Sequence, residues 1–195
     1  VIVAPAGVGK TWVLAAIGAN AMKRGKHIVH YTLELNEAYV GLRYDSILTG
    51  VANQNLKYHK DDVQSEMDKL KGDLIIKYYP TKTASVHTIS AHLKRIITLG
   101  TEVDMVIVDY GDILKDTGYA REVRHALGNI YEDLRGLAGE FQIPIWTASQ
   151  ANRSALDEDV IEAQKVAESY QKVMTADFVM SLSRKVEDKI GNTGR

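Results

Sequence analysis

Short apolar runs alternate along the chain with longer stretches of helical periodicity. Runs rich in Val, Ile, Leu or Tyr predict strands at residues 1–3, 27–33, 74–79, 103–109, 143–149 and 178–183. Between them, amphipathic spacing or a capping residue predicts helices over about residues 10–23, 37–48, 60–72, 86–97 and 123–141. Strands that are separated by helices pair in parallel through crossover connections. The pattern therefore predicts an α/β fold with a mostly parallel central sheet that is covered by helices.

Glycines and short polar residues mark where several of these helices begin and end. Asn36 and Ser85 can cap the helices that follow them, because their side chains accept hydrogen bonds from the first free N–H groups. Gly25 and Gly50 follow two helices at positions where a left-handed backbone favours glycine. The longest irregular stretch covers roughly residues 151–175, although parts of it can be helical, and a loop of that length inside a domain is usually functional or mobile.

The residues after the first strand resemble a phosphate-binding loop. The run VIVAPAGVGKT fits the pattern G-x-x-x-x-G-K-[ST], except that Ala4 replaces the first glycine. That position lies farthest from the phosphates, and the strand before the loop and the helix after it argue against a chance match. Lys10 would contact the β- and γ-phosphates, and the Thr11 hydroxyl would coordinate Mg²⁺. The predicted nucleotide-binding residues are Ala6, Gly7, Val8, Gly9, Lys10, Thr11 and Trp12.

Three polar residues end other predicted strands, and the carboxyl ends of parallel strands share one edge of a sheet. Asp109 can hold Mg²⁺, directly or through a water, or it can simply cap a turn. Glu34 can activate water; because Leu33 and Leu35 flank it, we expect a half-buried carboxylate rather than a surface one. Gln150 can hydrogen-bond a γ-phosphate or cap a turn. The predicted catalytic residues are Lys10, Glu34 and Gln150, and the predicted metal ligands are Thr11 and Asp109.

Composition narrows the class of protein without naming a function. The 195 residues suffice for a sizeable core, and we expect residues 1–195 to form a single domain. The chain has no cysteine, which excludes disulfides, thiolate zinc sites and cysteine nucleophiles. Its apolar runs are too short to span a membrane. The formal net charge of -1 argues against a protein that coats nucleic acid non-specifically, and the composition fits a cytoplasmic protein.

Five segments follow in an order and spacing that resemble the DnaB-type replicative helicases, above all phage or plasmid versions. They are APAGVGKT (4–11), YTLELNEAYVGLR (31–43), MVIVDYGDIL (105–114), LRGLAGEFQIPIWTASQANRS (134–154) and TADFVMSLSR (175–184). The glutamate-ended strand with Arg43 on the next helix, and the Ser-Gln-x-Asn-Arg stretch, are more specific than the loop alone. The resemblance covers nearly the whole chain and implies a RecA-like P-loop NTPase core with helices on both faces of the sheet.

The resemblance also implies an activity and partners. The chain would be the ATP-hydrolysing motor domain of a hexameric replicative helicase that translocates on single-stranded DNA and unwinds duplex. ATP and Mg²⁺ would be its cofactors, with the roles on the residues that the chemistry already indicates. Self-association into a hexameric ring is implied for the full-length protein, with a primase and a helicase loader as further partners. The expected location is the cytoplasm of a bacterial or phage-infected cell, and no membrane is expected as a partner.

The chain departs from the family pattern at both ends. Family members carry a Lys-x-Arg-x-Gly stretch whose arginine completes the neighbouring subunit's site, and EDKIGNTGR (187–195) contains none. We therefore expect that arginine finger beyond Arg195. Val1 already lies inside a strand, and the family's amino-terminal domain and linker helix are missing. We expect a catalytic core that is truncated at both ends.

Two loops are candidates for DNA contact. The family resemblance places residues 111–124 and 151–165 at a central channel, where Lys115, Arg121, Arg124 and Arg153 would hold the phosphodiester backbone. Acidic residues in both segments dilute this charge, so two solvated loops are the alternative. The resemblance favours weak, sequence-independent DNA binding that needs the contributions of several subunits.

Two other ATPase classes remain open. A RecA- or RadA-like recombinase has a catalytic glutamate at a comparable place, and a KaiC-like regulatory ATPase would act on protein without a DNA role. The YTLEL and Ser-Gln-x-Asn-Arg stretches favour the helicase interpretation over both.

Overall fold

A parallel sheet forms the centre of the molecule in the computed structural model, which describes residues 1–118, 122–151 and 171–183. The described part of the sheet has six strands in the order β3-β2-β4-β5-β1-β6, and every neighbouring pair is parallel. The strands are β1 (Ile2–Ala4), β2 (Ile28–Thr32), β3 (Leu74–Tyr78), β4 (Met105–Asp109), β5 (Ile145–Gln150) and β6 (Met180–Ser181). The parallel sheet confirms the predicted α/β class.

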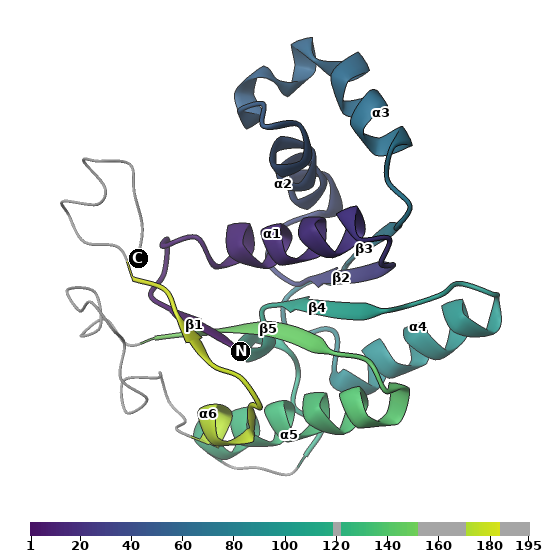
Figure 1. Cartoon of the computed structure of the whole chain (residues 1–195). Helices are drawn as coiled ribbons and strands as arrows, with labels where there is room; N and C mark the ends of the chain where they lie inside the picture. The colour runs from purple at the N-terminus through teal and green to yellow at the C-terminus, as the bar shows by residue number, and fades with distance from the viewer. Residues whose placement is uncertain (119–121, 152–170, 184–195) are drawn as a thin grey trace.

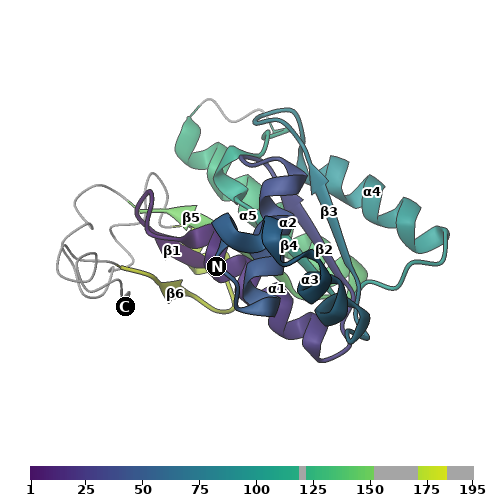
Figure 2. The ribbon, with the colours of Figure 1, turned by 90° about the horizontal axis from the view of Figure 1, so that it is seen from above.

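Helices cover both faces of this sheet (Figure 1). The helices are α1 (Lys10–Lys23), α2 (Glu37–Thr49), α3 (Lys60–Asp68), α4 (Val86–Thr98), α5 (Val123–Phe141) and α6 (Gln171–Thr175). Figure 1 shows α1, α2 and α3 on one side of the sheet and α4, α5 and α6 on the other, and Figure 2 looks down on the first layer. None of the helices in the described ranges is both long and apolar enough to cross a membrane.

The alternating side chains of the central strand β4 divide the core into two layers. Val106 and Val108 pack with residues of α4 and α5, whereas Ile107 packs with residues of α1 and α2. All three are fully buried. This alternation is the reason a continuous apolar run predicts a strand with a helix layer on each side.

The predicted caps of α2 and α4 and the predicted glycines after α1 and α2 are confirmed. The Asn36 side chain accepts a hydrogen bond from the Tyr39 N–H at 3.1 Å, and Ser85 forms a capping box with Thr88. Gly25 and Gly50 follow their helices with φ of 77° and 74°. The local chemistry of these residues therefore positions α2 and α4 correctly along the chain.

Other parts of the secondary structure differ from the prediction. The charged helix α3 ends at Asp68, not at residue 72, because the chain must turn so that Gly72 can lie against the Lys26 backbone, where a Cβ would overlap it. Strand β6 is only two residues long in the described part, shorter than the predicted 178–183. Residues 171–175, at the end of the stretch in which parts can be helical, form α6, and two short 3₁₀ helices, η1 (Asn53–Tyr58) and η2 (Gly111–Ile113), were not predicted.

Candidate nucleotide-binding site

Strand β1 leads through a tight loop into α1, and this loop has the geometry of an anion-binding site. Gly7 and Gly9 have φ of 75° and 115°, a conformation that other residues rarely adopt. Gly9 is the N-cap of α1 and has no side chain to occupy the first N–H groups of the helix. Those N–H groups, with the positive end of the helix dipole, can bind a phosphate.

Ala4 explains how the loop tolerates the missing first glycine. It is the last residue of β1, fully buried, and it pairs with Gln150 of β5. A residue in an extended strand does not need the conformational freedom of glycine, so alanine fits this position.

Lys10 begins α1 and turns back over the loop. Its Nζ donates hydrogen bonds to the carbonyl oxygens of Pro5 at 3.2 Å and Ala4 at 3.5 Å, and lies 5.6 Å from the centre of the Tyr110 ring. Partial burial lowers its pKa, and the nearby carboxylates of Asp109, Glu34 and Asp112 act in the opposite direction. The Lys10 ammonium therefore lies among acidic groups beside the phosphate-binding loop, where a bound phosphate would compete with these carboxylates for its charge.

Asp109 and Thr11 meet beside the loop. Asp109 ends β4 with only 2% of its surface exposed, and the Thr11 side chain hydrogen-bonds to its carboxylate. Burial raises the pKa of Asp109 to about 6, although the Thr11 hydrogen bond and the charges of Arg43 and Lys10 oppose the shift. A hydroxyl oxygen next to a carboxylate is a donor set that suits Mg²⁺, so these two residues fit the predicted metal site.

Glu34 lies at the same edge but is more exposed than predicted. Thr32, the last residue of β2, pairs with Asp109, and the Leu33 N–H donates to the Asp109 carbonyl oxygen at 2.9 Å. Leu33 turns into the core, so the next side chain, Glu34, points outward and is exposed rather than half-buried. Its charge still acts on Lys10 and Asp109, which shows that the carboxylate is near the loop.

Gln150 ends β5 directly beside the start of the loop. Its backbone N–H donates to the Asp112 carboxylate at 3.0 Å, and the next N–H, of Ala151, donates to the Ala4 carbonyl oxygen at 3.0 Å. The predicted convergence of Lys10, Glu34, Asp109 and Gln150 at one edge of the sheet is therefore what the structure shows.

Arg43 is a further basic residue at this site, and the sequence singled it out only as part of the family pattern. Its guanidinium lies over the Trp12 ring at 5.4 Å, and its Nη1 is buried without a hydrogen-bond partner among the described residues. Partial burial lowers its pKa, against the raising effect of Asp109 and Glu34. A buried, unsatisfied guanidinium N–H beside the phosphate loop is available to an anionic ligand. Trp12 thus contributes to the site by holding Arg43 as well as through its place in α1.

The predicted DNA-contact residues are only partly described. The Lys115 side chain is exposed, and the backbone N–H of this residue donates to the Ala84 carbonyl oxygen at 2.8 Å. Arg124 lies in the first turn of α5, and its side chain is outside the described residues. Arg121 and Arg153 lie outside the described residues, as does the segment 187–195.

Asp112 corrects one expectation. The sequence suggests an acid that dilutes the charge of a solvated loop, but the side chain is only 12% exposed and pairs with the buried Lys172 at 3.0 Å. Spacing could not reveal this pair, because its partners are brought together only by the fold.

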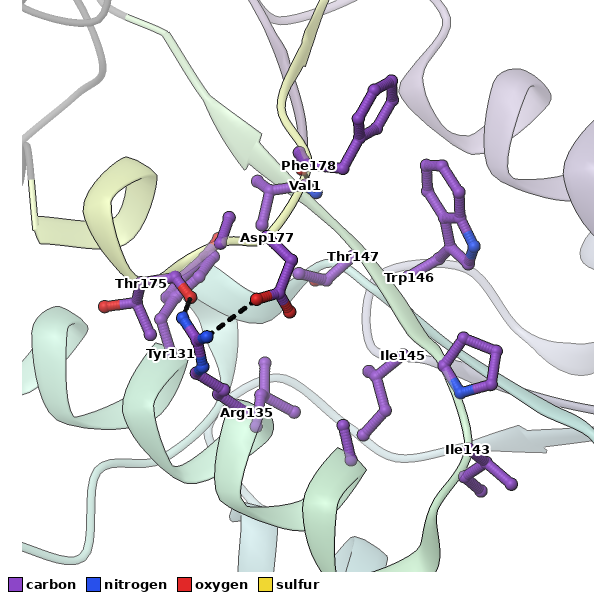
Figure 3. Close-up of a pocket in the computed structure, with 14 residues that line it drawn as sticks. Val1, Tyr131, Arg135, Ile143, Ile145, Trp146, Thr147, Thr175, Asp177 and Phe178 are labelled. Atoms are coloured by element: carbon purple, nitrogen blue, oxygen red, sulfur yellow. Dashed lines mark hydrogen bonds and ion pairs between the residues drawn. The ribbon is translucent and has the colours of Figure 1, made fainter.

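A separate cavity of about 350 Å³ opens at the amino ends of the strands, opposite the carboxyl ends that carry the candidate nucleotide site (Figure 3). Val1, Ile145 and Trp146 line it at the amino ends of β1 and β5, and Arg135 closes one side through hydrogen bonds to Thr175 and Asp177 at 2.6 and 2.7 Å. It contains no residue of the phosphate loop, so it is distinct from the candidate nucleotide site.

Together the glycine-rich loop, the buried aspartate and the parallel sheet define a P-loop nucleotide-binding domain of the RecA-like type. The family model of the DnaB-like helicase C terminal domain matches residues 1–192, and the chain belongs to this family.

Relatives agree with this assignment. The chain is 27% identical over 194 residues to a DnaB-like replicative helicase of Enterobacteria phage T4, covering 93% of this chain and 41% of the relative. It is 24% identical over 157 residues to the replicative DNA helicase DnaB of Helicobacter pylori (strain 26695), covering 78% of this chain and 32% of the relative. It is 23% identical over 193 residues to a probable plasmid replicative DNA helicase of Chlamydia trachomatis, covering 95% and 42%. The chain thus spans less than half the length of these relatives.

Two solved structures share the fold. One, described as an ATPase domain, has a TM-score of 0.80 at 18% identity, with 98% of this chain and 70% of that chain covered. A DnaB-like replicative helicase, described with its interactions with primase, has a TM-score of 0.80 at 18% identity and covers 98% and 48%. These likenesses confirm the RecA-like fold, and the family favours the helicase interpretation over the recombinase and KaiC-like alternatives.

Proposed function

We propose that the chain is the ATP-hydrolysing motor domain of a replicative DNA helicase that translocates on single-stranded DNA and unwinds duplex. The observation that carries the proposal is the convergence of Lys10, Thr11, Asp109 and Glu34 on one phosphate-binding loop, within a chain of the DnaB-like family.

The loop and Lys10 bind the nucleotide. The free N–H groups at the start of α1 hold the phosphate oxygens, and Lys10 exchanges its hydrogen bonds to Pro5 and Ala4 for the β- and γ-phosphates. Thr11 and Asp109 hold Mg²⁺, which supplies charge neutralisation on the phosphates when bound. The proton on Asp109 would compete with Mg²⁺, because the raised pKa leaves the free carboxyl partly protonated near pH 6, so metal binding should strengthen as the pH rises through 6.

Glu34 is the proposed general base. Its carboxylate is exposed at the edge of the site, so a water can reach it, and its charge acts on Lys10, Arg43 and Asp109 across the loop. It accepts a proton from the water that attacks the γ-phosphate. Gln150 and Arg43 are proposed to contact the γ-phosphate, the first as a neutral donor that detects its loss and the second as a cation that stabilises developing charge.

The DNA and assembly roles extend the proposal to the complete protein. Lys115, Arg121, Arg124 and Arg153 are proposed to contact the backbone of single-stranded DNA, with several subunits of a hexameric ring contributing together. A solved relative is described with its primase interactions, and we propose a primase and a helicase loader as partners here also. The proposed location is the cytoplasm of a bacterial or phage-infected cell.

The test uses the complete protein with three single substitutions. Lys10→Ala should abolish nucleotide binding. Glu34→Gln should bind ATP but hydrolyse it about 10²–10⁴-fold more slowly, because the amide keeps the size and cannot accept the proton. Glu37→Gln is the matched control: this exposed glutamate lies three residues further on, and its carboxylate accepts a hydrogen bond from the Tyr78 N–H at 2.9 Å.

Turnover should be measured with and without single-stranded DNA, and unwinding on a forked duplex. Parent-like hydrolysis by Glu34→Gln would refute the base assignment. Strand exchange without unwinding, or turnover that ignores DNA, would refute the helicase assignment and leave the ATPase assignment standing.

A further inference from the structure

One carboxylate, that of Asp112, collects donors from three separate elements of the fold. Oδ1 accepts a hydrogen bond from the Tyr131 hydroxyl at 2.8 Å and lies 3.0 Å from the Lys172 ammonium. Oδ2 accepts from the Ser149 hydroxyl at 3.2 Å and from the Gln150 N–H at 3.0 Å. Tyr131 belongs to α5, Ser149 and Gln150 to the end of β5, and Lys172 to α6.

This ion pair is removed from water. The Lys172 side chain is 1% exposed and that of Asp112 12% exposed. Lys172 Nζ also lies 3.4 Å from the Ser149 hydroxyl, although the two residues are 23 positions apart in the sequence. A buried pair with this many hydrogen bonds allows only a narrow range of geometry, because any departure leaves a charge desolvated and unpaired.

The pair is directly connected to the nucleotide site. Asp112 follows Asp109 by one short turn, and its hydrogen bond to the Gln150 N–H fixes the end of β5. Gln150 pairs with Ala4, whose carbonyl oxygen also accepts a hydrogen bond from Lys10. A displacement at the end of β5 therefore has a continuous polar path from the phosphate loop to α6.

We propose that Asp112 is a positioning residue that couples the two ends of this path, so that nucleotide-driven displacement of Gln150 moves α6 through the Asp112–Lys172 ion pair. The inference rests on the proposed function of Gln150. The competing account is that the pair only stabilises the fold, in which case α6 does not respond to nucleotide through it.

A reporter on α6 separates these accounts. The chain has no cysteine, and Met174 on α6 is 66% exposed, so Met174→Cys offers one attachment point for an environment-sensitive fluorophore. The probe ligand is a non-hydrolysable ATP analogue with Mg²⁺, and its binding is measured independently by calorimetry. The variants in the labelled chain are Lys172→Met and Asp112→Asn. The matched control is Lys82→Met, which removes a lysine that donates to the main-chain carbonyl oxygen of Asp112, not to its carboxylate.

The labelled parent and Lys82→Met should show the same saturable change in emission on binding the analogue. Lys172→Met and Asp112→Asn should bind the analogue and lose that change. Thermal melts check folding, and Lys172→Gln, which keeps a donor for Ser149 without the charge, replaces Lys172→Met if the latter does not fold.

A full response in Lys172→Met or Lys172→Gln would overturn the coupling, and so would a silent reporter in a parent that binds the analogue. Equal loss in Lys82→Met would also overturn it, since the effect would not then belong to the ion pair. Failure of the proposed function is distinguishable. A parent that does not bind the analogue overturns the nucleotide site and the coupling with it. An undiminished response in Gln150→Ala overturns the sensor role of that amide and, with it, a coupling driven by Gln150, whereas a full response in the Lys172 variants overturns the coupling alone.

Discussion

A histidine in the core gives a sharp prediction about stability and pH. His30 lies in the middle of β2 and is completely buried, with Nδ1 2.9 Å from the Tyr44 hydroxyl. Its Nε2 has no hydrogen-bond partner among the described residues. Burial lowers the pKa of this imidazole from 6.5 to about 3, and the positive charge of Arg43 adds to the effect. The folded chain therefore keeps His30 neutral over a pH range in which the unfolded chain protonates it.

The sign and size of the effect follow directly. Below about pH 6.5 the unfolded state binds a proton that the folded state does not, so the stabilising contribution is complete above that pH and is lost as the pH falls toward 3. The free energy of unfolding should decrease by about 1.4 kcal/mol per pH unit in this range. Between pH 7 and pH 5 the loss from His30 alone is about 2 kcal/mol.

Asp109 acts in the opposite direction. Its pKa is raised from 3.8 to about 6, so the folded carboxyl binds a proton before the unfolded one does, and its contribution to stability grows as the pH falls through 6. The total pH dependence of the parent therefore mixes two effects, and only a difference between variants isolates His30.

The assay is urea unfolding at pH 7 and pH 5 for two variants. Tyr44→Phe keeps the imidazole, whereas the pair His30→Leu with Tyr44→Phe removes both polar partners and leaves no hydroxyl unsatisfied. The free energy of unfolding should fall between the two pH values by about 2 kcal/mol more in Tyr44→Phe than in the pair. An equal fall in both variants would refute the assignment of a neutral, buried His30.

Two further predictions concern the same layer of the structure. Gly18→Ala should lower the free energy of unfolding by roughly 1–3 kcal/mol, because its Cβ would overlap the Tyr44 hydroxyl and lie 3.0 Å from Ile107 Cδ1. Urea unfolding should show that Tyr44→Phe partly rescues this variant, and an unchanged urea midpoint for Gly18→Ala would contradict the close approach of α1 and α2. Arg43→Lys keeps the charge and loses the planar group over Trp12, so ATP hydrolysis should fall roughly 10²-fold and Trp12 fluorescence should change. The control Arg95→Lys, on the exposed face of α4, should leave both readouts unchanged. Parent-like turnover by Arg43→Lys would refute a role for Arg43 in the nucleotide site.

Several features could be predicted because their causes are local. Lys10–Lys23 was predicted as a helix with the bounds that the structure shows, since the loop glycines and the residues after Lys23 define both ends. The same holds for the caps at Asn36 and Ser85. The positions of Asp109, Glu34 and Gln150 followed from one rule, that parallel strands end at a common edge, and the register of β2, β4, β5 and β1 agrees with it.

The exposure of Glu34 shows the limit of such rules. Two flanking leucines suggested a half-buried carboxylate, but Leu33 is fully buried and turns its neighbour outward. A flanking residue reveals that a strand end is near the core, and the direction of each side chain there depends on how the chain leaves the sheet.

The main strands and helices, their order and the loop chemistry can be read from the sequence alone, because propensity, capping and periodicity act between residues a few positions apart. Which distant groups meet depends on the folded structure: Asp112 meets Lys172, Arg43 meets Trp12, and His30 meets Tyr44. Each of these pairs depends on how the helices cross the sheet, and nothing in the sequence positions of the paired residues distinguishes them from ordinary solvated residues. The physical reason is burial, since a carboxylate, an imidazole or a guanidinium acquires its unusual charge behaviour only where the fold removes water and supplies a partner.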